Sequence, residues 1–304
     1  MIINLLPGLI DAYLKELVMK IEIEVVDIHF WILHILFTLG IIGGLLYKIS
    51  TILQGGLQEF GEEKRLSRWH KFWYFVGKFF KNFFSRKFIP IIKVLIFDVI
   101  LHSKLFKENK LKWLAHTFLF WGILVLFILS VLSGIAVEVA PALGYKPGVS
   151  EFMDGLANKD NWVTAVLNEL LNVVILIGVI IAFIRGFISK KKIGMMLFSD
   201  IFLIIFIIVI LISGWFTEAI RYIIENTPGY IAKLGFLGYY LSRLVQFSFP
   251  QATIDAWVAV YKVFWHVHVS VIWLSFVYIP FSKFAHAIFS PIASVINVLE
   301  KKKV

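Results

Sequence analysis

Five long apolar segments constrain this chain more than any other feature. They are residues 28–48, 113–137, 163–185, 201–222 and 263–288. A helix needs about 20 residues to cross the hydrocarbon core of a bilayer. Inside lipid every backbone polar group must be satisfied within the chain, and continuous apolar runs of this length favour helices over a barrel. The sequence therefore predicts an all-α, polytopic membrane helical bundle with about five transmembrane helices and the lipid bilayer as its surroundings.

The composition supports this class and excludes others. Hydrophobic residues make up 60% of the 304 residues and charged residues only 16%. The formal net charge of +10 would suit nucleic acid, but in a membrane protein a basic excess usually belongs to cytoplasmic loops. We therefore predict no nucleic-acid partner. The chain has no cysteine, so any iron–sulfur cluster in its pathway must belong to a partner.

The distribution of basic residues predicts the orientation. One side of the predicted bundle would carry 22 of the 30 Lys and Arg residues, most of them in the loop 49–112, the turn 185–200 and the tail 289–304. The positive-inside rule places that side in the cytoplasm. We therefore expect a multi-pass protein of the cytoplasmic (inner) membrane with its N-terminus outside and its C-terminus in the cytoplasm.

The sequence divides into three parts. Residues 1–27 mix short apolar runs with acidic and basic residues, and we expect an amphipathic lead-in on the membrane surface. Residues 28–288 form the transmembrane bundle, and residues 289–304 form a cytoplasmic tail. The loops 138–162 and 223–262 are expected to be irregular caps over an outward-facing site.

The long cytoplasmic loop 49–112 is both basic and aromatic. It contains the run WHKFWYFVGKFFKNFFSRK, a pattern typical of a segment at an anionic lipid surface. Within the loop, residues 88–101 are too short and interrupted for a sixth span. We expect an interfacial helix or half-hairpin there, which either helps to dock a cytoplasmic partner or only lies on the lipid.

The histidines carry the main functional signal, because ionisable side chains inside a membrane tend to mark function. His116 begins the second apolar segment and His286 ends the fifth, so both are expected at the cytoplasmic side. His268 precedes His286 by 18 residues, or five helical turns, which would place both on one face of a single helix about 27 Å apart. His34, in the first segment, is the candidate partner of His268 at the outer side.

Other histidines fit these pairs less well. His29 lies beside Asp27 at the expected membrane surface, and His266 is out of phase with His286. His70 and His102 fall in the cytoplasmic loop, where a solvated or interfacial role is expected. Two imidazoles from different helices, without thiolates or carboxylates nearby, fit haem b better than a bare metal ion. A histidine near a helix end can also simply bond a neighbouring carbonyl.

Three stretches resemble a known family: DVILHSKLFKENKLKWLAHTFLFWG, SGWFTEAIRY and FWHVHVSVIWLSFVYIPFSKFAH. Between residues 98 and 291 the chain resembles the respiratory membrane cytochrome b subunits, which include the nitrate reductase gamma subunit, the heterodisulfide reductase membrane subunit and the DsrM-type subunit. The resemblance implies that His116 and His286 ligate a cytoplasm-proximal haem and that His268 ligates an outer haem.

One position departs from the nitrate reductase branch, which has a second histidine ten residues after the first where this chain has Leu126. Either the outer haem takes its other ligand from the first span, as with His34, or it is absent.

The resemblance implies electron transfer between a menaquinone-type quinol and a cytoplasmic iron–sulfur subunit resembling heterodisulfide reductase. It leaves open the direction of flow and further membrane or periplasmic redox subunits. Glu218 and Arg221 share a helix face and are candidates for the quinol pocket, with a helix-end ion pair as the alternative. Glu169 and Asn172 are further pocket candidates. A second hypothesis is a haem-free transporter or assembly scaffold whose histidines relay protons.

Overall fold

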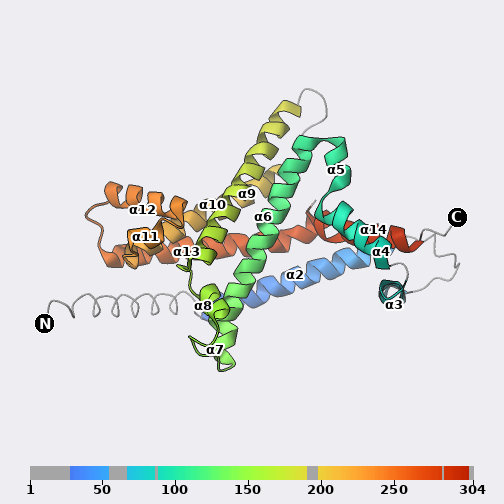
Figure 1. Ribbon diagram of the computed structural model, residues 1–304, viewed down its shortest axis with the longest axis horizontal. Helices are drawn as coiled ribbons and strands as arrows, with labels where there is room; N and C mark the ends of the chain where they lie inside the picture. Colours follow the sequence, from blue (N-terminus) through green and yellow to red (C-terminus); the bar gives the residue numbers. More distant parts are fainter. Residues whose placement is uncertain (1–27, 55–66, 86–87, 190–197, 283, 301–304) are drawn as a thin grey trace.

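The computed structural model describes residues 28–54, 67–85, 88–189, 198–282 and 284–300, and within these ranges the regular elements are helices (Figure 1). Five helices are long and apolar enough to cross a membrane, which confirms the predicted all-α membrane bundle. They are α2 (Ile28–Gln54), α6 (Lys110–Gly134), α9 (Trp162–Ser189), α10 (Phe198–Ile224) and α13 (Ile254–Tyr278).

Shorter elements connect the five long helices or flank them. Between α2 and α6 lie α3 (Arg68–Phe83), α4 (Phe88–Val94), the π-helix η2 (Leu95–Ile100) and α5 (Ser103–Glu108). After α6 come the π-helix η3 (Ile135–Val139), α7 (Ala140–Ala142) and α8 (Glu151–Ala157). Helices α11 (Gly229–Ala232) and α12 (Phe236–Ser248) precede α13, and the 3-10 turn η4 (Ile279–Phe281) and α14 (Ala285–Glu300) follow it.

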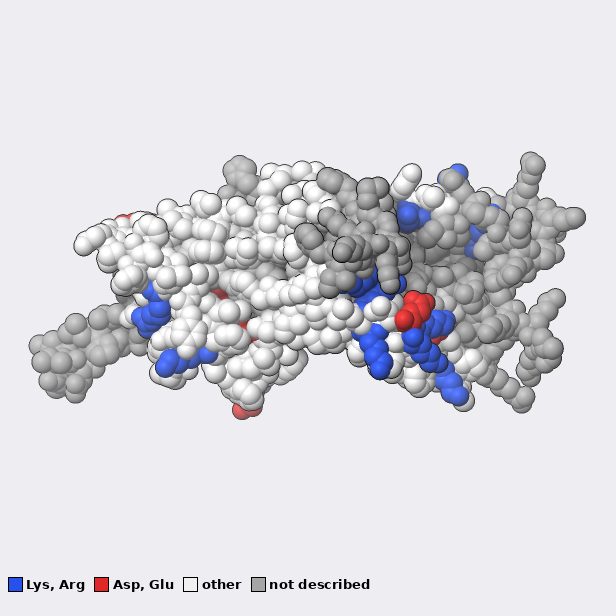
Figure 2. Space-filling view, turned by 90° about the horizontal axis from the view of Figure 1, so that it is seen from above, with Lys and Arg blue, Asp and Glu red and all other residues white. Residues whose placement is uncertain are grey.

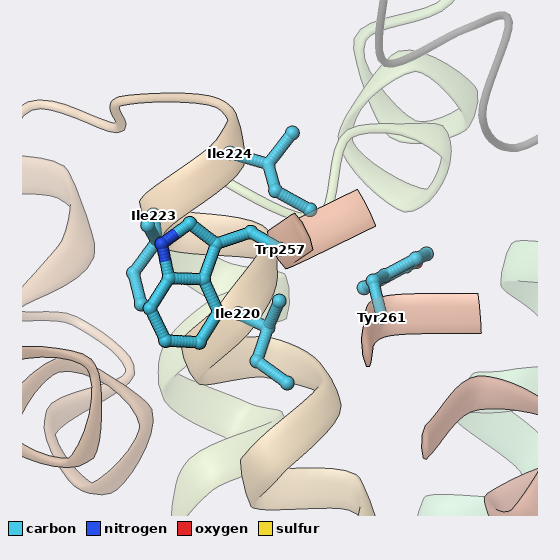
Figure 3. Close-up of a cluster of buried hydrophobic side chains, with 5 residues drawn as sticks. All are labelled: Ile220, Ile223, Ile224, Trp257 and Tyr261. Carbon is cyan, nitrogen blue, oxygen red and sulfur yellow. The ribbon is translucent and has the colours of Figure 1, made fainter. Parts of the chain in front are cut away.

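Helices α10 and α13 pack through a compact apolar core at one end of the pair. Ile220, Ile223 and Ile224 of α10 lie against Trp257 and Tyr261 of α13, and all five are at least nine-tenths buried (Figure 3). This core includes the last turn of α10 and the first turns of α13. It therefore fixes the end of the bundle from which α12 also extends.

Helix α2 runs beside α13 and in the same direction (Figure 1). Near its start, the Phe30 ring lies 5.3 Å from the Trp265 ring and 5.1 Å from the Trp273 ring. Near its end, Gly44 lies against Pro280 and Phe281, where a Cβ would meet carbon atoms 3.1 Å away. The glycine thus lets α2 approach the end of α13 closely.

Helices α6 and α9 form a second pair, inclined to the first in Figure 1. Gly122 of α6 is buried against Ile175 of α9, and Gly178 of α9 lies against the backbone of Leu119. Residues without a side chain let helix backbones approach closely, which is the usual way that helices associate in lipid. The chain thus alternates between two ends, which we name the α12 end and the α14 end after the helices found there.

On the face drawn in Figure 2, the Lys and Arg side chains form two groups, one on either side of the centre. The surface between the two groups is mostly uncharged apart from a few acidic side chains. An apolar belt between two polar rims is the surface that a bilayer requires.

The expected continuous helix over residues 263–288 is wrong. Helix α13 ends at Tyr278, the chain passes through η4, and α14 begins at Ala285. Pro280 explains the break, because proline lacks a backbone N–H and clashes with the preceding turn of a helix. The Ser282 hydroxyl then accepts a hydrogen bond from the Phe284 N–H at 3.0 Å. His268 and His286 therefore belong to two different helices and do not share one helix face.

The loops expected on the outer side are also more regular than predicted. Residues 223–262 contain α11, α12 and the first two turns of α13, which starts where the Thr253 side chain accepts a hydrogen bond from Ala256 N–H at 3.3 Å. Residues 138–162 contain α7 and α8. The expected lead-in 1–27 lies outside the described residues, as do parts of the loop 49–112 and the end of the tail. Residues 88–101 are helical, and Ile91 is fully buried against Val295 of α14.

The packing of α6 on α9 predicts the effect of adding one methyl group. A Cβ on Gly122 would lie 2.5 Å from Ile175 Cγ1, whereas a Cβ on Gly134 of the same helix would meet nothing within 4 Å. Gly122→Ala should therefore lower the free energy of unfolding by about 1–3 kcal/mol relative to Gly134→Ala. The measurement is SDS-induced unfolding in mild detergent, followed by circular dichroism. Equal stability of the two variants would contradict the tight crossing.

Candidate functional site

Three histidines meet at the α14 end of the bundle. The His116 ring in α6 lies 5.7 Å from the His286 ring in the first turn of α14, with their planes 24° apart. On its other side the His116 ring lies 4.5 Å from the His102 ring, nearly perpendicular to it. The structure thus brings together the predicted pair His116 and His286, and it adds His102.

Two tryptophans of α6 hold His102 in this position. Trp113 Nε1 donates a hydrogen bond to the Leu101 carbonyl at 2.9 Å, and Trp121 Nε1 donates to the Ile100 carbonyl at 3.0 Å. His102 itself has a left-handed backbone, with φ at 49°, so the chain turns sharply between η2 and α5. The carbonyls released by the end of the π-helix are therefore bound to α6, and the turn points His102 at His116.

Of the two roles expected for His102, solvated or interfacial, free solvation does not match the structure. The ring contacts His116 and Phe120, and its Nδ1 is buried without a hydrogen-bond partner among the described residues. Burial lowers the pKa of His102, so the ring is neutral near pH 7 and its free nitrogen can act as a ligand or acceptor. The spacing of the histidines could not predict this contact, because the π-helix η2 and the left-handed turn at His102 lie between it and a regular helix.

His268 lies in the middle of the span Ile254–Phe281, between α13 and α10, and not near the outer edge where the sequence placed it. Its Nδ1 lies 3.0 Å from the Ser213 hydroxyl, and that hydroxyl donates to the Val209 carbonyl at 2.6 Å. With the hydroxyl proton directed at Val209, the serine oxygen is free to accept from an imidazole that carries its proton on Nδ1. Nε2 then keeps its lone pair. A Cβ on Gly214 would lie 3.0 Å from the ring, so glycine is needed for this close approach.

His34 does not face His268. Its ring contacts Phe30 and lies 5.1 Å from the Trp273 ring of α13. Residues 268 and 273 are about 140° apart around a helix, and His268 faces α10. The predicted outer partners are thus on different faces of α13. The Nδ1 of His34 is buried without a partner among the described residues. His266 is exposed and its ring contacts the adjacent Trp265.

Arg221 is buried at the α12 end, but it does not pair with Glu218. Its two terminal nitrogens bind Asp160 at 2.8 Å and Glu225 at 2.6 Å. The side chain is only 10% exposed, so this is a nearly desolvated charge held between two carboxylates. Arg221 thus forms ion pairs near the helix end, but with Asp160 and Glu225 instead of the expected Glu218, and these contacts hold it in place rather than in an open pocket.

Glu218 and Glu169 approach the start of α12 from two different helices. The Glu218 carboxylate accepts a hydrogen bond from the Tyr222 hydroxyl at 2.9 Å, and it lies against Gly235 and Gly238. Glu169 of α9 is 1% exposed, and one of its oxygens accepts from the Leu237 N–H. Sequence reasoning named both acids, but it missed the backbone of 235–238, which lies in a segment expected to be irregular.

The donor sets fit haem better than a bare metal ion. Among the described residues no group of three or more histidines, acids or cysteines is arranged to hold a metal ion. Single histidines on separate helices, surrounded by aromatic and aliphatic side chains, are instead the donors that a haem iron takes. A haem is bound by an apolar surface and one or two axial nitrogens, and His116, His286 and His268 offer such nitrogens.

The fold and these residues define a multi-pass membrane protein with three histidines clustered at the α14 end and a fourth, His268, in mid-span. The nitrate reductase gamma subunit family matches residues 101–298, so the chain belongs to this family. The match confirms the predicted resemblance, and it covers His102, His116, His268 and His286 but not His34. The family is of the cytochrome b type, which agrees with the expected haem b.

Curated relatives support the same class. One of the subunits of a dihydromethanophenazine:CoB–CoM heterodisulfide reductase is 27% identical in Methanosarcina barkeri over 68% of this chain and 66% of the relative. Its Methanosarcina mazei counterpart is 28% identical over 68% of each chain. An EtfAB:quinone oxidoreductase from Syntrophomonas wolfei is 28% identical over 56% of this chain but only 23% of the relative. The chain thus spans about two thirds of the heterodisulfide reductase relatives. No solved structure matches it.

These comparisons make the chain a membrane subunit of a redox complex, active in electron transport. The five membrane-length helices place it as a multi-pass membrane protein, in agreement with the expected cytoplasmic membrane.

The contacts of Arg221 predict a large stability effect. Arg221→Gln would leave Asp160 and Glu225 without their cation in a nearly buried site, so the free energy of unfolding should fall by about 3 kcal/mol. Arg243→Gln, which changes an exposed arginine on α12, is the matched control and should be nearly neutral. Thermal unfolding in detergent, followed by circular dichroism, compares them. Similar melting temperatures for both variants would show that the buried ion pairs contribute little.

Proposed function

We propose that this chain is a haem b-containing membrane subunit of a respiratory complex. It transfers electrons between a menaquinone-type quinol pool and a cytoplasmic iron–sulfur partner that resembles heterodisulfide reductase. The observation that carries the proposal is the close approach of His116 and His286 from two separate helices in a chain of this family. The haem supplies a one-electron carrier, and the chain holds it and separates it from water.

The proposed ligands of the haem at the α14 end are His116 and His286. The His116 and His286 rings, 5.7 Å apart on separate helices, would leave more room for a bound group than the edge contact between His102 and His116 at 4.5 Å. His102 would then be a neighbour that packs against the ligand.

In mid-span, farther from the α14 end than the first pair, His268 is one proposed ligand of a second haem. Its Ser213 contact fixes the ring and leaves Nε2 free, which is the usual arrangement around a metal-binding histidine. The other axial position has His34 as its candidate, although the two rings lie on different faces of α13. The proposal is therefore two haems per chain, and His34 is the ligand that most needs a direct test.

The orientation follows from charge. The α14 end carries the predicted cytoplasmic segments, and the proposed iron–sulfur partner would dock there, close to the haem of His116 and His286. The quinol would react at the α12 end beside Glu218. By their names, the relatives act on dihydromethanophenazine with CoB–CoM heterodisulfide, and on quinone. Electrons that cross from the α12 end to the α14 end while protons are released outside would conserve energy.

Single histidine replacements test the ligands. His116→Ala and His286→Ala should each remove one haem from the purified chain, because an axial ligand is lost. His102→Ala should retain that haem. Pyridine haemochrome spectra and haem-to-protein ratios give the count.

Other outcomes of these replacements would assign different ligands or exclude a haem. A chain that loses haem with His102→Ala but keeps it with His286→Ala would have His102 and His116 as its ligand pair. An unchanged haem count in His34→Ala would remove His34 from the outer site. A wild-type chain without any b-type spectrum would contradict the cytochrome proposal and favour the haem-free transporter or scaffold.

Ser213 provides a second, independent prediction. Ser213→Ala removes the acceptor that fixes the His268 ring, and loss of such a contact typically weakens metal binding by about 10–100-fold. Ser275→Ala is the control, since the Ser275 hydroxyl in α13 donates to its own helix, at the Val271 carbonyl, at 2.7 Å. Haem titration into the apoprotein, followed by optical spectroscopy, measures both affinities. Equal affinity in the two variants would show that Ser213 does not orient a ligand.

A further inference from the structure

Glu169 is the most completely buried acid described in this chain, and no step of the proposed function uses it. It is 1% exposed, within a membrane-spanning helix. One carboxylate oxygen accepts the Leu237 N–H at the start of α12, and the other, Oε2, is buried without any partner among the described residues. An unpartnered oxygen in an apolar setting is costly unless something binds it.

Glu218 reaches the same place from α10. The negative charge of Glu218 acts on Glu169, and both acids contact residues 235–238. A Cβ on Gly238 would lie 2.8 Å from Glu218 Oε2, so this glycine leaves the space that the carboxylate occupies. The two side chains, which we call the carboxyl pair, thus reach one short backbone segment from separate membrane helices.

The charges around this pair do not balance. The acids at this site are the pair itself, Asp160 and Glu225. The cations are Arg221 and Lys159. Arg221 is held by Asp160 and Glu225, and neither member of the carboxyl pair forms an ion pair among the described residues. Tyr222 also faces Glu218, but as a neutral donor. Two carboxylates that reach one apolar segment without an ion pair of their own disfavour the doubly charged state, which a bound proton or a metal cation would relieve.

The hydrogen bonds favour the proton. Two of the four carboxyl oxygens already accept from donors, Leu237 N–H and Tyr222 O–H, whose hydrogens point at the carboxylates. A metal cation would need most of these oxygens and would be repelled by the donors. A single shared proton needs only the oxygen atoms that remain.

We propose that Glu169 and Glu218 form a proton-accepting site that holds one shared proton and takes a second from a quinol hydroxyl. In that transfer the quinol O–H bond breaks, its electron pair stays on the quinol oxygen, and an O–H bond forms on the free carboxylate oxygen. No electron moves in this step. The shared proton is a property of the chain itself, whereas the quinol as proton donor rests on the proposed function.

Infrared spectroscopy of the full chain in lipid nanodiscs tests the shared proton. The wild type should show, near pH 7, a carbonyl band of a protonated carboxylic acid that shifts in D₂O. The Glu169→Gln variant should lack this band, although its amide oxygen can still accept the Leu237 N–H. Glu151→Gln, an exposed acid in α8, should leave the band unchanged.

The outcomes separate the alternatives. A band that survives in both Glu169→Gln and Glu218→Gln would overturn the proposal. A band that appears in the wild type only after sodium and divalent cations are removed would overturn it in favour of a cation site.

The proton transfer from the quinol is tested by a separate measurement. Under the proposed function, Glu169→Gln should slow the reduction of haem by a menaquinol analogue about 100-fold, with unchanged haem content and spectrum. An unchanged rate would exclude Glu169 from the reaction. If the wild type binds no haem or does not oxidise the analogue, the proposed function fails, while the infrared band still decides whether the pair shares a proton.

Discussion

The scarcity of polar partners inside lipid governs this structure. A bilayer offers no water to satisfy a buried donor or acceptor, so each polar side chain within the helices must find its partner in the chain. The long helices are almost wholly apolar, and their few polar side chains find partners within the chain, as Ser213 and His268 do in mid-span. His116 meets two other imidazoles, and Arg221 is held between two carboxylates. The same requirement makes the unpartnered oxygen of Glu169 chemically meaningful.

The helix breaks arise from the need to place such groups. Pro280 ends α13, and the chain then starts α14 in a new direction that carries His286 to His116. A π-helix and a left-handed residue likewise turn His102 back onto α6. Straight helices would leave these rings apart, so the irregular backbone produces the histidine cluster rather than disturbing it.

The sequence predicted what depends on hydropathy and little of what depends on backbone breaks. Span number and fold class follow from apolar length, and the approach of His116 to His286 follows from which ends share a side of the membrane. The five-turn relation of His268 to His286 assumed a continuous helix that Pro280 interrupts. His102 could not be placed from spacing, because its own left-handed turn sets its direction. Glu218 and Arg221 lie one turn apart as predicted, but spacing cannot show that Asp160, 61 residues earlier, takes the arginine.

The two ends of the bundle differ in a way that favours a direction of chemistry. At the α14 end the three clustered histidines supply imidazoles, which in their neutral form can bind a metal centre without adding charge to the membrane interior. At the α12 end the buried groups are acids that outnumber their cations, whereas His268 lies in mid-span beside Ser213. A carrier that gives up protons together with electrons needs an acceptor for each, and the α12 end offers carboxylates for the first, with the imidazole of His268 deeper in the span for the second. The α14 end, where the described histidines have no such surplus of acids around them, suits the transfer of electrons alone.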